Sequence, residues 1–267
     1  MQLDQAGKKL VFLFARQRSG TGALSSLLNQ HDSCNYLGEV FGSALSQHSH
    51  HYFNWLQNAA KSGPELLLPD FAPRRFRAYL SYLSEVTDEQ VLVLDVKISQ
   101  THHFEPYDRG INARPGLYDL VRDLGGDVIF LRRQNLVRTY LSRLSATESD
   151  VWHAVEERPD LPLLNVDTKN MLRVLQQFAR REKYIDGLQK HFPGALVLTY
   201  ETLFDEVTNR LAPEAAESLA RVLGLSGLDQ LETQQRKLRP GRLEDIVENH
   251  FEVRQALTGT EFESMVQ

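Results

Sequence analysis

Residues 10–28 read LVFLFARQRSGTGALSSLL, and this stretch decides which fold we predict. Residues 10–15 form a short apolar run with one Val and two Phe, which is typical of a strand that is covered on both faces. A loop with two glycines follows, and from Thr21 onward the apolar positions repeat with a helical period. The stretch therefore predicts a strand, a tight glycine loop and a helix.

The rest of the chain repeats this alternation of strand and helix. Similar apolar runs predict strands at residues 91–96, 128–131 and 195–199. Helical periods cover residues 21–30, 73–84, 117–124, 135–146, 171–191 and 214–223. We therefore expect an α/β protein with a P-loop-like three-layer fold, in which helices cover a parallel sheet of about four to five strands. Because no segment is long enough to be a linker, we expect residues 1–267 to form a single domain.

Composition excludes several classes of protein. Of the 267 residues, 42% are hydrophobic and 24% are charged, which is ordinary for a globular protein and not for a disordered or collagen-like chain. The net charge of −5 disfavours a nucleic-acid binder. The single cysteine, Cys34, allows neither an internal disulfide nor a Cys-rich zinc site. No stretch approaches the roughly 20 apolar residues of a membrane span, and no signal peptide is recognisable, so we expect a cytoplasmic protein.

The loop after the first strand has the composition of a phosphate-binding site. Its glycines let the backbone approach a ligand closely, and the N-terminus of the following helix favours an anion. Arg18 adds a positive charge, and Ser19 and Thr21 add hydroxyl donors. The alternative is an ordinary strand–helix turn in which Ser19 or Thr21 caps the helix. Because no lysine follows Gly22, the pattern G-x-x-x-x-G-K-[ST] of ATPases and GTPases is absent.

A second basic cluster follows the strand predicted at residues 128–131. Arg132 and Arg133 stand at the carboxyl end of that strand, where open α/β sheets bind ligands. Arg138 and Ser142 are four residues apart and share one face of the next helix. Arginine binds phosphate through two parallel hydrogen bonds, so two such clusters indicate a ligand that is phosphorylated at two separated places. The alternative is a solvated basic surface.

Together these two clusters resemble the sulfotransferase family, which uses 3′-phosphoadenosine 5′-phosphosulfate (PAPS). RQRSGTGALSSLL looks like the loop that binds the 5′-phosphosulfate in that family. The resemblance implies that the loop residues which hold this group are Arg18, Ser19, Gly20, Thr21, Gly22 and Ala23. Gly22 departs from the hydroxyl residue usual at its position, which removes one donor.

Three other segments extend the resemblance. FLRRQNLVRTYLS is similar to the family's 3′-phosphate motif, which implies that Ser142 and either Arg133 or Arg132 bind that phosphate. ALVLTYETL resembles the strand whose tyrosine lies against adenine, here Tyr200. LRPGRLEDIVENHFEV resembles the loop and helix that close over the nucleotide. That loop would contribute Arg239 and Gly241, and Lys237 or Arg242 could replace the lysine that Pro240 displaces.

The resemblance also implies a general base for an acceptor hydroxyl. LGEVF, residues 37–41, is similar to a Gly-Glu-x-Phe segment whose glutamate is the proposed base in bacterial relatives, so Glu39 is our first candidate. His102 and His103 are the alternatives, because cytosolic relatives carry a base histidine after the corresponding strand. Arg18 would neutralise the leaving group. Lys97, at the end of that strand, would bind acceptor or cofactor.

The function predicted from the sequence is therefore PAPS-dependent transfer of a sulfuryl group to a hydroxyl of a small molecule or glycan, such as a carbohydrate or glycolipid. No metal is expected, because the histidines of residues 47–51 lack a cysteine or a regularly spaced carboxylate. Two alternatives stay open: a P-loop nucleotide kinase and a non-catalytic nucleotide-binding protein. The sequence does not address the acceptor's identity or the oligomeric state.

Overall fold

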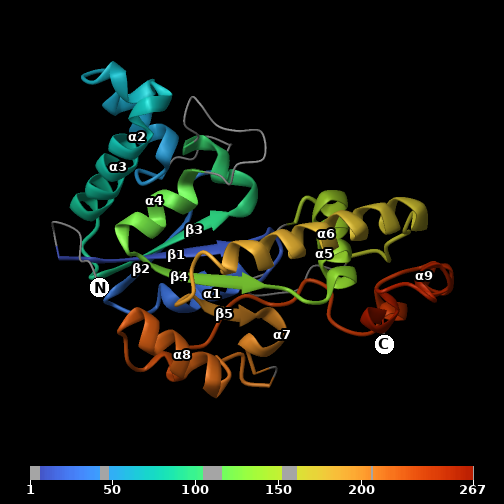
Figure 1. Ribbon diagram of the computed structural model, residues 1–267. Helices are drawn as coiled ribbons and strands as arrows, with labels where there is room; N and C mark the ends of the chain where they lie inside the picture. The colour runs from blue at the N-terminus through green and yellow to red at the C-terminus, as the bar shows by residue number, and fades with distance from the viewer. Residues whose placement is uncertain (1–6, 43–47, 105–115, 152–160, 206, 267) are drawn as a thin grey trace.

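The computed structural model describes residues 7–42, 48–104, 116–151, 161–205 and 207–266. Within these ranges five strands form one parallel sheet in the order β2-β3-β1-β4-β5 (Figure 1). The strands are β1 (Lys9–Ala15), β2 (Cys34–Glu39), β3 (Val91–Lys97), β4 (Asp127–Arg132) and β5 (Leu196–Thr199). The predicted α/β class and the parallel sheet of four to five strands are confirmed.

Helices cover both faces of this sheet (Figure 1). The six predicted helices are α1 (Thr21–Leu28), α3 (Ala72–Val86), α4 (Gly116–Leu124), α5 (Leu136–Ser149), α6 (Thr168–Gln189) and α8 (Pro213–Leu223). Three further helices are α2 (Tyr52–Ala59), α7 (Tyr200–Leu203) and α9 (His250–Leu257). Helices α1 and α8 cover one face, whereas α3, α4 and the C-terminal end of α6 cover the other. None of the helices in the described ranges is long and apolar enough to cross a membrane.

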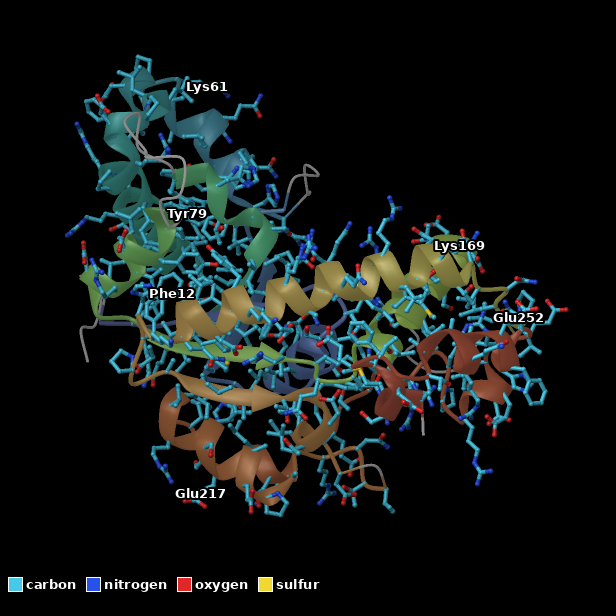
Figure 2. All side chains as sticks on the ribbon, turned by 45° about the vertical axis from the view of Figure 1, so that its right-hand side comes forward. Phe12, Lys61, Tyr79, Lys169, Glu217 and Glu252 are labelled. Atoms are coloured by element: carbon cyan, nitrogen blue, oxygen red, sulfur yellow. The ribbon has the colours of Figure 1, made fainter. Side chains whose placement is uncertain are left out.

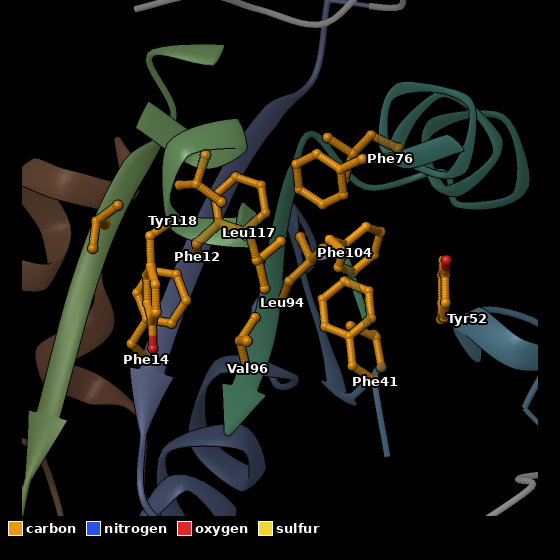
Figure 3. Close-up of a cluster of buried hydrophobic side chains, with 14 of the residues drawn as sticks. Phe12, Phe14, Phe41, Tyr52, Phe76, Leu94, Val96, Phe104, Leu117 and Tyr118 are labelled. Atoms are coloured by element: carbon orange, nitrogen blue, oxygen red, sulfur yellow. The ribbon is translucent and has the colours of Figure 1, made fainter. Parts of the chain in front are cut away.

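The central strand β1 shows why its sequence is apolar at every position. Phe12 and Phe14 point into the cluster formed with α3 and α4, where Phe76 and Tyr118 pack against them (Figure 3). Leu13, on the other face, belongs to the cluster beneath α1 and α8. Because both faces are buried, the strand reads as a continuous hydrophobic run rather than as an alternating one.

Of the five strands, β2 is the one that we did not predict by position. Its sequence, CNYLGE, mixes polar and apolar residues because it lies at the edge of the sheet. Its register against β3 shifts between Tyr36 and Glu39, and Gly38 has a positive φ of 72°. Because Glu39 is the last residue of β2, it lies at the carboxyl edge of the sheet.

Helix α6 joins the sheet to a third group of helices. Its C-terminal residues Ile185 and Leu188 pack on the sheet, whereas Met171 and Leu175 pack with α5 and α9. Figure 2 shows its length, from the sheet to the N-terminal end near Lys169. This arrangement places α5 and the segment before α9 beyond the ends of the strands (Figure 1), on the side where the candidate site lies.

Candidate active site

A cleft of about 720 Å³ opens at the carboxyl edge of the sheet. It is lined by the loop after β1, by Lys97 at the end of β3, by Arg133 just after β4 and by Tyr200 just after β5. Because all the strands are parallel, their carboxyl ends meet at this one edge, which is the usual binding edge of open α/β sheets. Segments that are far apart in the sequence thus contribute to one site.

The loop after β1 is shaped for close approach of a ligand to the backbone. Gly20 is the N-cap of α1 with a φ of 93°, a conformation that only glycine adopts readily. A Cβ atom at Gly20 would lie 2.3 Å from Cδ2 of Tyr200, so the packing of this ring also requires glycine. In the described chain no side chain caps α1, and residues 20–23 line the cleft. The amide groups of the first helical turn are therefore available to an anion.

The wall of the cleft is positive although the whole chain carries a net charge of −5. Among the described lining residues, seven are cationic and three are carboxylates. Fourteen of the residues singled out from the sequence line the cleft: Arg18, Gly20, Thr21, Gly22, Ala23, Glu39, Lys97, Arg133, Arg138, Ser142, Tyr200, Lys237, Arg239 and Gly241. Five others are absent from its described lining: Ser19, Arg132, Arg242, His102 and His103.

The two predicted basic clusters meet inside the cleft. Arg18 Nε donates a 2.9 Å hydrogen bond to Ser142 Oγ, and Arg133 Nη1 donates to the carbonyl oxygen of Arg18 at 3.2 Å. The Arg133 guanidinium carbon lies 4.6 Å from the centre of the Tyr200 ring, within the range of a cation–π contact. Burial lowers the pKa of Arg133 and of Arg18, so each guanidinium would gain from an anionic partner.

The structure distinguishes the two neighbouring arginines. Arg132 turns away from the cleft and pairs with Glu182 and Asp186 of α6, each at 2.7 Å. Arg133 lines the cleft, and its buried Nε atom has no hydrogen-bond partner among the described residues. Of the two, Arg133 alone lies where it can touch a ligand in the cleft.

A buried polar network fixes Lys97 beneath the loop. Lys97 is only 1% exposed, and its Nζ atom lies 2.8 Å from Thr21 Oγ1 and 2.7 Å from Asp95 Oδ2. Tyr36 donates from its hydroxyl to Asp95 Oδ2 at 2.9 Å. Burial, and then the neighbouring Asp95 carboxylate, raise the pKa of Tyr36 well above its usual value, so it stays a neutral donor.

Asp95 and Tyr36 were missed in the sequence analysis. Asp95 carried a usable signal, because it is the single acidic residue in the apolar run VLVLDVK, where an unpaired charge would be costly. Tyr36 carried none, because the strand that contains it was not predicted.

Glu39 lies where the cleft meets a second one. Its Oε2 atom accepts a 2.9 Å hydrogen bond from Gln100 Nε2, and its Oε1 atom is 3.6 Å from Lys97 Nζ. Its side chain is 46% exposed. Glu39 and Gln17 line both the main cleft and a neighbouring cleft of about 690 Å³. The carboxylate is thus accessible, oriented by a neutral donor and close to a buried cation.

The two candidate histidines belong to the segment after β3, Ile98–Phe104, and lie outside the described lining of either cleft. His103 meets the Phe53 ring edge to face at 4.7 Å, and burial lowers the pKa of His103 to about 4. His102 Nδ1 lies 3.1 Å from the carbonyl oxygen of Ser99. The contacts of both rings are therefore local, with residues of this segment and with Phe53.

The loop before α9 closes the cleft against α5. Arg239 Nε donates to Ser145 Oγ at 2.7 Å, and Arg138 Nη2 donates to the carbonyl oxygen of Gly241 at 2.7 Å. Gly241 has a φ of 101°, which requires glycine at this turn. Within the described ranges, no group of three His, Cys, Asp or Glu residues is arranged to hold a metal ion.

The structure is similar to several solved structures of other proteins. The structure is similar to the crystal structure of a sulfotransferase from Alicyclobacillus acidocaldarius, with 12% sequence identity, a TM-score of 0.45, and coverage of 97% of this chain and 93% of that one. No family model matches the chain, and no curated protein is similar enough in sequence to count as a relative. Any assignment of activity therefore depends on the residues of the cleft.

Proposed function

We propose that this protein is a sulfotransferase that uses PAPS as sulfuryl donor and a hydroxyl group as acceptor. The observation that carries the proposal is the cationic cleft at the carboxyl edge of the sheet, whose lining includes both the uncapped first turn of α1 and an accessible carboxylate, Glu39. A donor with two anionic ends suits the cationic side of such a cleft. An acceptor hydroxyl suits the carboxylate side.

The residues of the cleft fit such a donor. The buried Nε atom of Arg133 lacks a partner within the described chain, and a ligand phosphate would supply one. Gly20 and Gly22 let two cleft residues, Tyr200 and Gln235, pack closely against the start of α1, whose first turn has no side-chain cap. The cleft volume of about 720 Å³ lies in the range of small-molecule and cofactor sites.

Each end of the donor has candidate residues in the cleft. Arg18 and the backbone amides of residues 21–23 would hold the 5′-phosphosulfate at the N-terminus of α1. Ser142, Arg133 and Arg239 would hold the 3′-phosphate between α5 and the loop before α9. Arg132 has no part in this site because it pairs with α6. Tyr200, beside Gly20 and Arg133, is the candidate for contact with the adenine.

When bound, PAPS supplies an activated sulfuryl group whose departure leaves negative charge on a phosphate oxygen. Arg18 and Lys97 are the cations that would stabilise this charge, and Thr21, which accepts from Lys97, orients the lysine toward α1. Glu39 would accept the proton of the acceptor hydroxyl on its exposed carboxylate. Gln100 holds that carboxylate through Oε2, which directs the other oxygen toward Lys97.

The second cleft is the candidate acceptor site because it shares Glu39 and Gln17 with the first. Its described lining includes five neutral hydrogen-bonding residues and three histidines: Gln17, Asn29, Asn35, Tyr36, Gln100, His48, His50 and His51. Glu39 is the one carboxylate of that lining, and neither lysine nor arginine belongs to it. Such a surface favours an uncharged acceptor with several hydroxyl groups.

Transfer of labelled sulfate from PAPS to a panel of neutral glycans and simple alcohols, in the presence of EDTA, tests this proposal. We expect acceptor-dependent transfer by the wild-type protein and none by the Arg18→Ala variant. Phosphorylation of a nucleotide by ATP and magnesium, without sulfate transfer to any member of the panel, would contradict the proposal and would favour a nucleotide kinase.

A further inference from the structure

Residues 232–235 run along α1 and lead into the loop before α9, which we call the closing loop (residues 237–242). Gln30 Nε2 donates to the carbonyl oxygen of Glu232 at 2.7 Å, and the backbone N–H of Gln234 donates to Ser26 Oγ at 3.1 Å. Thr233 N donates to the carbonyl oxygen of Asn209 at 3.0 Å. These contacts fix the backbone on both sides of Thr233, and the next side chain along α1 toward its N-terminus is Gln235.

The amide of Gln235 lies directly on Gly22. A Cβ atom at Gly22 would be 2.7 Å from Gln235 Oε1 and 2.9 Å from Gln235 Nε2, closer than real side-chain contacts. Gly22 lies in the first turn of α1 and is not among the described residues with positive φ, so its backbone does not itself require glycine. The lack of a side chain at Gly22 therefore provides the space that the Gln235 amide fills.

The position of this amide makes it part of the anion site. Gln235 and Gly22 both line the main cleft, and the amide lies beside the uncapped first turn of α1. An amide NH₂ group is a neutral donor that can bond a phosphate or sulfate oxygen next to the backbone N–H groups. Because the residue belongs to the segment that leads into Lys237 and Arg239, it also links the closing loop to α1.

We propose that Gln235 is an anion-binding residue, whose side-chain amide donates to the phosphate or sulfate group held at the N-terminus of α1, and that Gly22 is glycine to admit it. This inference depends on the proposed function, since it requires the cleft to bind the anionic donor. It adds a residue from the C-terminal part of the chain to a site that otherwise consists of the loop after β1, the first turn of α1 and Lys97 of β3.

Four variants test the inference: Gln235→Ala, Gly22→Ser, the double variant Gly22→Ser with Gln235→Ala, and the control Gln234→Ala. The measurement is the affinity for 3′,5′-diphosphoadenosine by calorimetry, with unliganded melting curves to verify folding. Gln235→Ala should bind about tenfold more weakly, since it loses one hydrogen bond to a charged group. Gly22→Ser should lose a similar amount because its side chain displaces the amide.

In the double variant the serine hydroxyl has room to bind the anion, so the affinity for diphosphoadenosine should return to within about threefold of the wild-type value. Two substitutions that acted independently would not restore the affinity in this way. Gln234→Ala should bind like the wild type, because Gln234 contacts α1 through its backbone. Undiminished affinity in Gln235→Ala, or a double variant whose loss equals the product of the single losses, would overturn the inference and leave the proposed function intact. A wild-type protein that binds no diphosphoadenosine would overturn both.

Discussion

Lys97 Nζ donates a 2.8 Å hydrogen bond to Thr21 Oγ1, and this contact joins the end of β3 to the first turn of α1. The lysine is held from below by both oxygens of Asp95, at 2.8 and 2.7 Å. A buried cation is thus fixed beside the proposed anion site, and its counter-ion, Asp95, is buried and absent from the described lining of the cleft. Such preorganised charge is what a reaction that develops negative charge requires.

Replacing Lys97 should affect stability and turnover separately. Lys97→Met leaves the Asp95 carboxylate buried and unpaired, so the free energy of unfolding should fall by about 3–5 kcal/mol. The double variant Lys97→Met with Asp95→Asn removes both charges and should recover most of this loss. Sulfate transfer should stay at least about 100-fold reduced in both variants, because the cation is gone. Urea denaturation and transfer rates at saturating donor provide the measurements; normal transfer in the double variant would refute the role of Lys97.

Arg132 and Arg133 are neighbours in the sequence but should have different roles, so substitutions of the two can be compared directly. Arg133→Met removes a cleft cation, so affinity for 3′,5′-diphosphoadenosine should drop by about 10- to 100-fold, as for loss of a charge-assisted contact. Arg132→Met should keep that affinity but lower the free energy of unfolding by about 1–2 kcal/mol, because Asp186 loses its ion pair with Arg132 and Glu182 keeps only its pair with Arg16. Calorimetric titration measures the affinity of both variants for the nucleotide, and denaturation measures their stability. Weaker binding by Arg132→Met with unchanged binding by Arg133→Met would mean that Arg132 binds the ligand.

Glu39→Gln should preserve nucleotide binding and abolish most turnover. Glutamine keeps the size of the side chain but cannot accept the proton of the acceptor, so the rate should fall by roughly 10²- to 10⁴-fold. His102→Ala and His103→Ala should each cost much less, because neither side chain lies in the described lining of the cleft. Transfer rates at saturating donor and acceptor compare the three variants. An active Glu39→Gln beside an inactive histidine variant would assign the chemistry to the segment after β3.

The sequence predicted most of the architecture because its central strands are buried on both faces. The runs at residues 10–15, 91–96 and 128–131 carry that burial in their composition, and each corresponds to a strand. The edge strand β2 could not be recognised in this way, since CNYLGE has one exposed edge and contains a glycine with positive φ.

The candidate site was predictable where residues are neighbours in the sequence. The loop after β1 and the Arg133–Ser142 pair were recognised because their members follow strand ends. Arg132 and Arg133 could not be told apart, because the partners of Arg132, Glu182 and Asp186, lie some 50 residues away on α6. The contact of Gln235 with Gly22 likewise depends on tertiary packing that no local pattern encodes.

His103 should make stability depend on pH. In the unfolded chain a histidine takes up a proton near pH 6.5, whereas burial in the fold lowers the pKa of His103 to about 4. Between these values the unfolded state binds more protons, so this contribution to stability is complete above about pH 6.5 and is lost as the pH falls toward 4. Denaturation of wild type and His103→Gln at pH 7 and pH 5 measures the effect. The variant should lose less stability on acidification than the wild type; equal losses would mean that the pKa of His103 is the same in the folded and unfolded states.

The most direct test of the account compares 3′,5′-diphosphoadenosine with 5′-AMP by titration calorimetry and thermal unfolding in EDTA. We expect diphosphoadenosine to bind far more tightly than AMP without a divalent metal, because Arg133, Ser142 and Arg239 bind the second phosphate. At about 100 times its dissociation constant it should add roughly 2.7 kcal/mol to the free energy of unfolding. Equal affinity for the two nucleotides, or binding of either only when magnesium is added, would contradict the account.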